Sequence, residues 1–246
     1  MSLQGDIGLS APFAGPLYAQ VAAMLRGKIC SSEWSASEPL PNEAALAKDM
    51  GVSIGTVRKA LEMLEQERLI NRRQGRGTFI VQISEETELQ RFSNFVSNGK
   101  KLKAETSKVT SEVADANADE ILKLRLKAGD KVIRLETVWG ASQRLKAFEK
   151  ISVPHARFPG LERQQTRTGQ FLFPLYRQAF QVVITQVAEK VSCINADDKL
   201  AEILGVRPQQ AVLQIDRIAK AMTVGDVEWS TRFVHLTDAH YAVLMS

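Results

Sequence analysis

Residues that suit contacts with a phosphate or a nucleic-acid base gather in one short stretch of the chain, between residues 40 and 81. Arginine bonds a guanine edge or a phosphate in bidentate fashion, and hydroxyl side chains suit phosphate oxygens. Glycine allows tight turns and a close approach of the backbone. The binding set that we single out is Asn42, Glu43, Ser53, Gly55, Thr56, Arg58, Lys59, Arg73, Gly75, Arg76 and Gly77. Most of these residue types are compatible with a surface that contacts a nucleic acid.

A first short helix is predicted at the start of the stretch. Asn42 can serve as its N-cap, and Gly51 supplies a permissive residue past its end. Leu46, Ala47 and Met50 recur at helical spacing and give the helix one apolar side.

A second helix is predicted after a tight turn, with Ser53 as its N-cap. Its apolar positions at helical spacing are Val57, Ala60, Leu61 and Leu64. The polar residues at its start fall largely outside that stripe. A helix in the major groove presents such N-terminal side chains to base edges, while the preceding helix crosses the backbone.

Two apolar segments around a basic glycine turn come next and predict a β-hairpin. The segments are residues 69–70 and 78–81, and the turn spans residues 72–77. Such a wing can reach a minor groove or a ridge of phosphates. The pattern alone equally allows a small helical cap with a solvated, charged hairpin.

A close resemblance to a known family decides between these interpretations. The stretch reads LPNEAALAKDMGVSIGTVRKALEMLEQERLINRRQGRGTFIV, and PLYAQVAAMLRGKI precedes it. Together, over residues 16–81, they resemble the winged helix-turn-helix of GntR-family bacterial transcription regulators, which implies operator DNA as a partner. Asn42 stands where many members have the Ser of an LPSE motif, and Ala44 where many have an Arg that helps read the operator. These departures mark where operator preference would differ from that of the relatives.

Composition and charge are those of an ordinary globular protein. The net charge of +4 over 246 residues is compatible with a polyanionic partner without requiring one, so the clustered arginines are more telling. Cys30 and Cys193 lie far apart, and none of the three histidines pairs with them. We expect free thiols, no metal site and no cofactor. No signal peptide or membrane-spanning run is evident, so we expect a cytoplasmic protein without a membrane partner.

Four segments are expected along the chain. Residues 1–15 read as a flexible leader, residues 16–81 as the DNA-binding domain, and residues 82–90 as a polar, acidic linker. Residues 91–246 form a second domain. No internal repeat is evident in the sequence.

Apolar runs predict that the second domain is rich in strands. Strands are expected over residues 106–113, 131–139, 145–153, 181–190, 212–222, 227–234 and 241–244. Helices are expected over residues 117–124, 172–178 and 196–204, the last capped by Asp197 or Asn195 and closed by Gly205. This order indicates an α+β fold with a largely antiparallel sheet.

The order of short motifs in this domain resembles the effector-binding UTRA domain. The motifs are RFSNF, TSKVTSEVADANADEILKLRLKAGDKVIRLETV, FEKISVPHARFPGL, PLYRQAF, ADDKLAEILGV, VLQIDRIAKA and DVEWS. UTRA domains are similar in fold to chorismate lyase and define the HutC branch of the GntR family. The resemblance spans residue 89 to the C-terminus and implies that this domain binds a small-molecule effector.

Polar residues inside apolar strands are candidates for the effector pocket, because such a pocket needs a few converging polar anchors. Residues of this kind are Arg134, Glu149, Arg217 and Glu228. A charge in a strand more often lies on the solvated face. The resemblance favours Glu149 and Glu228 and adds Ser93 and Tyr176, although a plain core position for Tyr176 is nearly as plausible.

Thr137 and Trp139 complete the candidate set with Arg134. UTRA domains that bind phosphorylated sugars often carry basic residues around these two positions. Trp in place of Arg removes an anion-binding fork and adds a flat apolar surface. We therefore expect an effector that is less phosphate-like, with an aromatic or apolar portion.

The resulting prediction is a homodimeric transcription regulator, most often a repressor, whose operator binding an effector controls. Two-fold operators require two recognition helices, and the second domain is expected to hold the dimer. The alternatives are a chorismate-lyase-like enzyme and a ligand-independent DNA-binding protein. The sequence contains no HExxH, P-loop or CxxC motif and no supported Ser-His-Asp arrangement, so we expect no catalytic residues.

Overall fold

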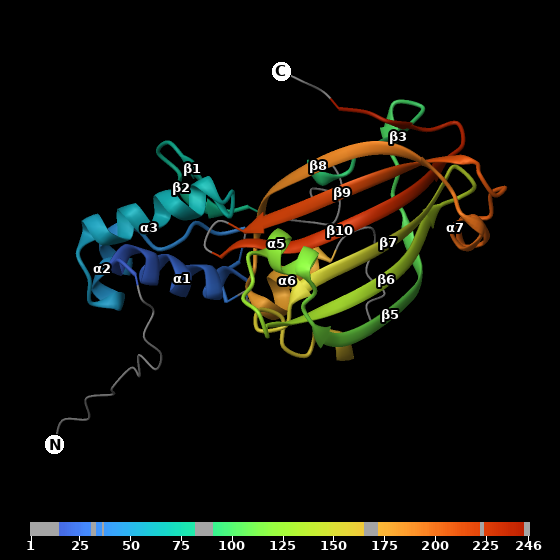
Figure 1. Cartoon of the computed structure of the whole chain (residues 1–246). Coiled ribbons are helices and arrows are strands. Elements are labelled where there is room, and N and C mark those ends of the chain that lie inside the picture. The colour runs from blue at the N-terminus through green and yellow to red at the C-terminus, as the bar shows by residue number, and fades with distance from the viewer. Residues whose placement is uncertain are drawn as a thin grey trace. The chain divides into compact units, whose positions relative to one another are not determined.

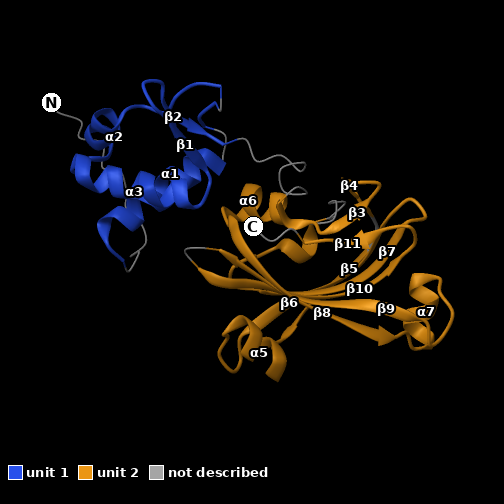
Figure 2. Cartoon of the chain, turned by 90° about the horizontal axis from the view of Figure 1, so that it is seen from above, with its two compact units in different colours: residues 1–82 blue, residues 83–246 orange. Residues whose placement is uncertain are grey.

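The structure is a computed structural model that describes residues 15–30, 33–35, 37–81, 91–164, 172–221 and 224–243. The chain divides into two compact units, residues 1–82 and 83–246, which Figure 2 colours separately. The expected leader and linker lie outside the described residues, apart from Gly15. No helix within the described ranges is long and apolar enough to cross a membrane.

Helices and a hairpin make up the described part of the first unit (Figure 1). The helices are α1 (Leu17–Cys30), α2 (Glu43–Met50) and α3 (Ile54–Gln66). The hairpin pairs β1 (Ile70–Arg73) with β2 (Gly77–Ile80). Leu25 of α1 and Leu64 of α3 are wholly buried in the core between the helices. The helices and the hairpin predicted from apolar spacing are confirmed.

Arg26 of α1 and Glu67, just past α3, form a buried ion pair that the sequence pattern did not indicate. Nε of Arg26 donates to Oε2 of Glu67 over 2.7 Å, and the two side chains are 7% and 2% exposed. Two charges can leave water here because each satisfies the other. The pair fixes α1 against the end of α3, whose start carries much of the binding set.

An antiparallel sheet of six strands is the main element of the second unit as described. Its order is β5 (Glu105–Asp115), β6 (Lys131–Ala141), β7 (Leu145–Pro154), β10 (Gly225–Leu236), β9 (Ala211–Ala221) and β8 (Ile184–Asn195). Every neighbouring pair is antiparallel. The predicted α+β class with a largely antiparallel sheet is confirmed.

The two faces of this sheet carry different elements (Figure 2). The face that we call inner carries α6 (Phe173–Phe180), η1 (Leu161–Arg163) and a small sheet of β3 (Phe95–Ser97), β4 (Lys100–Lys101) and β11 (His240–Tyr241). The outer face carries α5 (Ala118–Leu124) and α7 (Asp198–Leu204). The main core lies on the inner face, where Phe173 and Tyr176 of α6 pack on apolar residues of the sheet.

The sheet consists of two similar halves, each with a strand, a short helix and two further strands. The first half is β5, α5, β6 and β7, and the second is β8, α7, β9 and β10. Asn117 and Asp197 cap the two helices in the same way, and Arg125 and Gly205 end them in a left-handed conformation. An internal repeat that was not evident in the sequence therefore exists in the structure, where it rests on caps and turns.

Some expected elements differ from the observed ones. The strand expected over residues 181–190 begins only at Ile184, because Gln181 adopts φ 55° to end α6. The hairpin of β3 and β4 was not expected, although Asn98 and Gly99 both adopt positive φ, as a tight Asn-Gly turn requires. The strand expected over residues 241–244 is the short β11, and residue 244 lies outside the described ranges.

Candidate DNA interface and candidate effector pocket

Capping residues fix the first turns of α2 and α3. Oδ1 of Asn42 accepts a hydrogen bond from the backbone N–H of Ala45 over 2.8 Å. Oγ of Ser53 accepts one from the backbone N–H of Thr56 over 3.1 Å, and the two hydroxyl oxygens lie 2.9 Å apart. Both residues are thus the N-caps predicted from the sequence. The caps give the start of α3, where Gly55 is exposed, a defined geometry.

Glu43 at the start of α2 holds two arginines. Its Oε2 accepts hydrogen bonds from Nε (3.1 Å) and Nη2 (2.9 Å) of Arg58 on α3. Nη2 of Arg72 on β1 lies 3.9 Å from Oε1 of the same carboxylate. The hydrogen bond to Glu43 raises the pKa of the Arg58 guanidinium above its ordinary value, so Arg58 keeps its charge. Glu43 thus links both helices to the hairpin.

Aromatic rings support two further cations of the binding set. Nζ of Lys59 lies 4.6 Å from the ring centre of Tyr18 on α1. The guanidinium of Arg73 lies 4.8 Å from the ring centre of Phe79 on the neighbouring strand. Such cation–π contacts orient a charge without removing it from the surface. Both cations are exposed and able to meet a polyanion.

Two glycines shape the exposed tip of the hairpin. Gly75 adopts φ 70° and Gly77 φ 105°, conformations that favour glycine. The backbone N–H of Arg76 donates to the carbonyl of Arg73 over 2.9 Å and closes the turn. A Cβ at Gly77 would also lie 3.2 Å from the Cβ of Pro39. The glycines therefore serve the turn that presents the two arginines.

Glu149 is the centre of a buried polar cluster on the inner face of the sheet. Its Oε2 accepts a hydrogen bond from the indole N–H of Trp139 over 3.1 Å, and its Oε1 accepts one from Nε of Arg232 over 2.6 Å. All three residues are 2% exposed. A charged pair is tolerated at this depth because its members neutralise and hydrogen-bond each other.

Tyr176 of α6 reaches the same face, where its O–H donates to Oε2 of Glu228 over 2.8 Å. Burial, and next the charge of Glu228, raises the pKa of Tyr176, and burial also raises the pKa of Glu228. Burial, followed by the charge of Arg232, lowers the pKa of Arg217 to about 10. Ionisable groups gathered in apolar surroundings are characteristic of functional sites.

Two buried hydroxyl groups lie beside these charges, on Thr137 and Ser230. Neither has a hydrogen-bond partner among the residues that the structure describes. An unsatisfied buried hydroxyl costs about 1–3 kcal/mol, so each marks a place where a polar group of a ligand would be favourable. Ser93 is buried as well, between Phe92 and Phe95, which belong to the two cores of this face.

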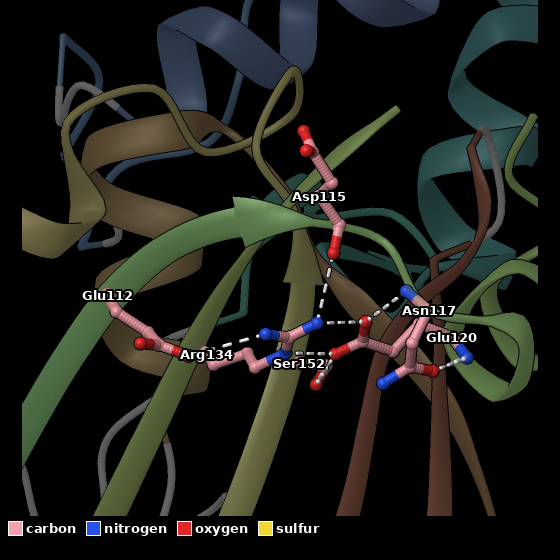
Figure 3. Close-up of polar contacts among 6 residues, drawn as sticks. All are labelled: Glu112, Asp115, Asn117, Glu120, Arg134 and Ser152. Carbon is pink, nitrogen blue, oxygen red and sulfur yellow. Dashed lines mark hydrogen bonds and ion pairs between the residues drawn. The ribbon is translucent and has the colours of Figure 1, made fainter. Parts of the chain in front are cut away.

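Arg134 does not join this cluster, because it lies on the outer face of the sheet (Figure 3). Its Nε and Nη2 donate to the carboxylate of Glu120 on α5 over 2.8 and 2.9 Å. Side chains alternate between faces along a strand, so Arg134 and Thr137, three residues apart, point to opposite sides. Arg134 lines an outer-face cavity of about 440 Å³ instead. The expectation that all seven effector candidates share one pocket does not hold for Arg134.

Several members of the inner-face cluster were not among the expected site residues. Arg232 is one, and its even spacing from Glu228 on β10 was the signal that could have found it. Glu189 of β8 is another: it accepts hydrogen bonds from Tyr241 and from the side-chain amide of Asn94. Burial, and next the hydrogen bond to Glu189, raises the pKa of Tyr241 to about 12.

Of the two cysteines, Cys30 is buried and Cys193 is exposed. In the described part of the chain, no group of three or more His, Cys, Asp or Glu side chains is placed to hold a metal ion.

Two family models match the chain, one in each unit. The model described as "Bacterial regulatory proteins, gntR family" matches residues 17–80, and the model described as "UTRA domain" matches residues 99–240.

Curated relatives match both regions together. The mannosyl-D-glycerate transport/metabolism system repressor MngR of Escherichia coli (strain K12) is 26% identical over 204 residues, which cover 81% of this chain and 83% of the relative. The HTH-type transcriptional repressor NagR of Bacillus subtilis (strain 168) is 24% identical over 204 residues, which cover 82% of this chain and 83% of the relative.

Solved structures of similar fold include two bacterial proteins. YydK from Bacillus subtilis has a TM-score of 0.53 at 16% identity, covering 94% of this chain and 100% of that one. PhnF from Mycobacterium smegmatis has a TM-score of 0.50 at 20% identity, covering 89% and 94%. At these identities the likeness shows the fold alone. The family models carry the assignment: the chain belongs to the UTRA-domain family and has a gntR-family helix-turn-helix domain ahead of its UTRA domain.

Proposed function

We propose that this protein is a DNA-binding transcription regulator that acts as a repressor. A small-molecule effector controls its binding to the operator. One observation carries the DNA-binding half of the proposal. The capped, exposed start of α3 presents Arg58, which Glu43 holds in place, next to a basic hairpin. In a helix-turn-helix protein this is the part of the molecule that enters the major groove.

Residues of the binding set take different roles in this proposal. Arg58 reads a base edge or clamps a phosphate, and Ser53, Thr56 and Lys59 contact phosphates. Glu43 acts as a positioning residue, because a carboxylate is repelled by phosphates but orients the guanidinium of Arg58 well. Asn42 is proposed to contact the DNA backbone beside its capping role.

The hairpin supplies further contacts to the DNA backbone or the minor groove. Arg73 and Arg76 are exposed at its tip, and Gly75 and Gly77 allow the turn to approach the duplex closely. Contacts of this kind add affinity that depends steeply on salt, because bound cations displace counterions from DNA.

The effector is proposed to bind on the inner face of the second unit. The support is the gathering there of buried polar groups within an otherwise apolar core. The proposed pocket residues are Ser93, Thr137, Trp139, Glu149, Tyr176, Arg217, Glu228 and Arg232. Arg134, on the outer face, is left out of this set.

Charge balance favours an effector that is less phosphate-like. The arginines of the cluster already face carboxylates: Arg232 pairs with Glu149, and Nε of Arg217 lies 3.7 Å from Oε1 of Glu189. A phosphate would have to displace these carboxylates at a cost in free energy. Trp139 adds an apolar surface for an aromatic or apolar part of the effector.

Several wider features belong to the same proposal. The protein is proposed to belong to the HutC branch and to act in the cytoplasm. It is also proposed to form a homodimer held by the second unit, which fits a regulator that reads a two-fold operator. A linker over residues 82–90 would transmit the effector's influence, provided that the effector binds one arrangement of the DNA-binding units better than another. The relatives are named as repressors, and no observation favours a chorismate-lyase-like reaction.

A mobility-shift assay with the full chain and DNA flanking its own gene tests the proposal. We expect a salt-sensitive complex that Arg58→Ala weakens. A thermal-shift screen of metabolites should then find a compound that stabilises the protein and changes its affinity for DNA. Absence of any specific DNA complex, or turnover of chorismate, would refute the proposal.

A further inference from the structure

We infer that Ile54 reads the methyl group of a thymine in the operator. The inference rests on the proposed function and deepens it, because it assigns a share of the sequence preference to one apolar residue of α3. Ile54 was not part of the binding set expected from the sequence, which gathered polar residues and glycines.

Ile54 is the first residue of α3, and its side chain is left in water. It is 47% exposed, whereas Val57, Ala60, Leu61 and Leu64 of the same helix are at most 2% exposed. A single exposed isoleucine is common on protein surfaces. The position of Ile54 is what suggests a contact with DNA, because the first turn of a recognition helix is the part that meets base edges.

The neighbours of Ile54 leave it as the projecting apolar group of that turn. The side chains of Ser53 and Thr56 are polar, and their hydroxyl oxygens lie 2.9 Å apart. Gly55 has no side chain, and a Cβ added there would have only Oγ of Ser53 within 4 Å, at 3.8 Å. The surface beside Ile54 is therefore open backbone that a base pair can approach.

The chemistry of the major groove gives this side chain one apolar target. Adenine, guanine and cytosine present donors and acceptors there, and thymine adds its C5-methyl group. A β-branched residue in a helix has few rotamers, so Ile54 loses little freedom on contact. Arg58 follows four residues later, on the same side of α3, so the methyl would lie near the base or phosphate that Arg58 meets.

The test combines altered DNA with altered protein. A duplex is first selected from a random library by the full chain, and each of its thymines is then replaced singly by deoxyuridine, which lacks the methyl. We expect at least one replacement per half-site to weaken binding about fourfold, the effect of one buried methyl group. In Ile54→Ala the same replacement should have no effect, and Ile54→Val should retain part of it.

Met24→Ala is the matched control, because Met24 is an exposed apolar residue, 42% exposed, that belongs to α1 and not to α3. It should leave the sensitivity to deoxyuridine unchanged. If no replacement weakens binding, or if the weakening persists in Ile54→Ala, the inference is wrong although the protein still binds DNA. If the selection enriches no sequence, the proposed function fails, and the inference fails with it.

Discussion

Glu149 on β7 and Arg232 on β10 face each other across neighbouring strands, with Oε1 and Nε 2.6 Å apart and both side chains at most 3% exposed. The pair lies 83 residues apart in sequence. Trp139 on β6 donates to the other oxygen of the same carboxylate, so three adjacent strands meet at Glu149. This arrangement joins the two halves of the sheet through charged side chains where an apolar core is usual.

Removal of Arg232 should therefore destabilise the second unit strongly. Arg232→Met leaves the carboxylate of Glu149 buried without its partner, which we expect to cost about 3–5 kcal/mol. The double variant with Glu149→Gln should recover part of the loss, because it removes the stranded charge. Urea unfolding followed by tryptophan fluorescence measures both, with Arg163→Met, an 86% exposed arginine side chain, as the control. A loss no greater than that of the control would contradict the assigned role.

Glu43 and Arg58 should respond differently to substitution. Arg58→Ala is expected to cost about 1–3 kcal/mol at the selected operator if the arginine reads a base.

Glu43→Gln removes a negative charge near the DNA, so affinity for a scrambled duplex should hold or rise while preference for the operator falls. Glu62→Gln, an exposed carboxylate of α3, is the charge-matched control and should keep that preference. Equal losses on both duplexes for Glu43→Gln would argue that Glu43 itself contacts DNA.

The arginines of the hairpin should act mainly through electrostatics. Arg76 is exposed at the tip, and Arg76→Ala should reduce the slope of log K against log salt concentration by about 0.9 if it neutralises one phosphate. Operator and scrambled duplex should lose affinity alike. Fluorescence anisotropy across a salt series measures the slope. An unchanged slope would place Arg76 away from the phosphates.

Local signals predicted much of the fold. Asn42, Ser53 and Asp197 were recognisable as caps because a short polar side chain precedes an apolar helical period, and each one accepts the expected hydrogen bond. Apolar alternation located the long strands within a few residues. The turn at Asn98-Gly99 carried an equally local signal that the apolar pattern of so short a hairpin obscured.

The site was harder to predict, because it depends on strand register. Side chains alternate between the two faces along a strand, and Arg134 is separated from Thr137 and Trp139 by an odd number of residues. This alternation alone could have placed Arg134 on the other face. The pairing of Glu149 with Arg232 follows from the alignment of β7 with β10, which no local pattern specifies. The internal repeat was not evident in the sequence because its two halves share caps and turns rather than side chains. Glu120 and Leu200, for example, occupy equivalent positions in α5 and α7 but differ in chemistry.

Glu120 gives a prediction for acid pH. Burial opposes ionisation, but the hydrogen bonds from Arg134, from the backbone of Asn117 and from Ser152 outweigh it and lower the pKa of Glu120. A carboxylate whose pKa is lowered on folding stabilises the protein above its unfolded pKa, near 4.5, and this contribution is lost as the pH falls through the folded value.

Glu120→Gln should therefore destabilise the second unit at pH 7 by about 1–3 kcal/mol, the usual loss for hydrogen bonds to a charged group. The difference from the unaltered protein should shrink as the pH falls below 4.5, because protonation then removes the same charge from Glu120. Urea unfolding of both proteins across this range measures it. Glu112→Gln is the control, since that side chain is 64% exposed and its Oε1 lies 3.3 Å from Nη1 of Arg134. A difference in unfolding free energy that stays constant with pH would contradict the prediction. It would show that the ionised form of Glu120 adds no stability, and that its hydrogen bonds act through packing and not through charge.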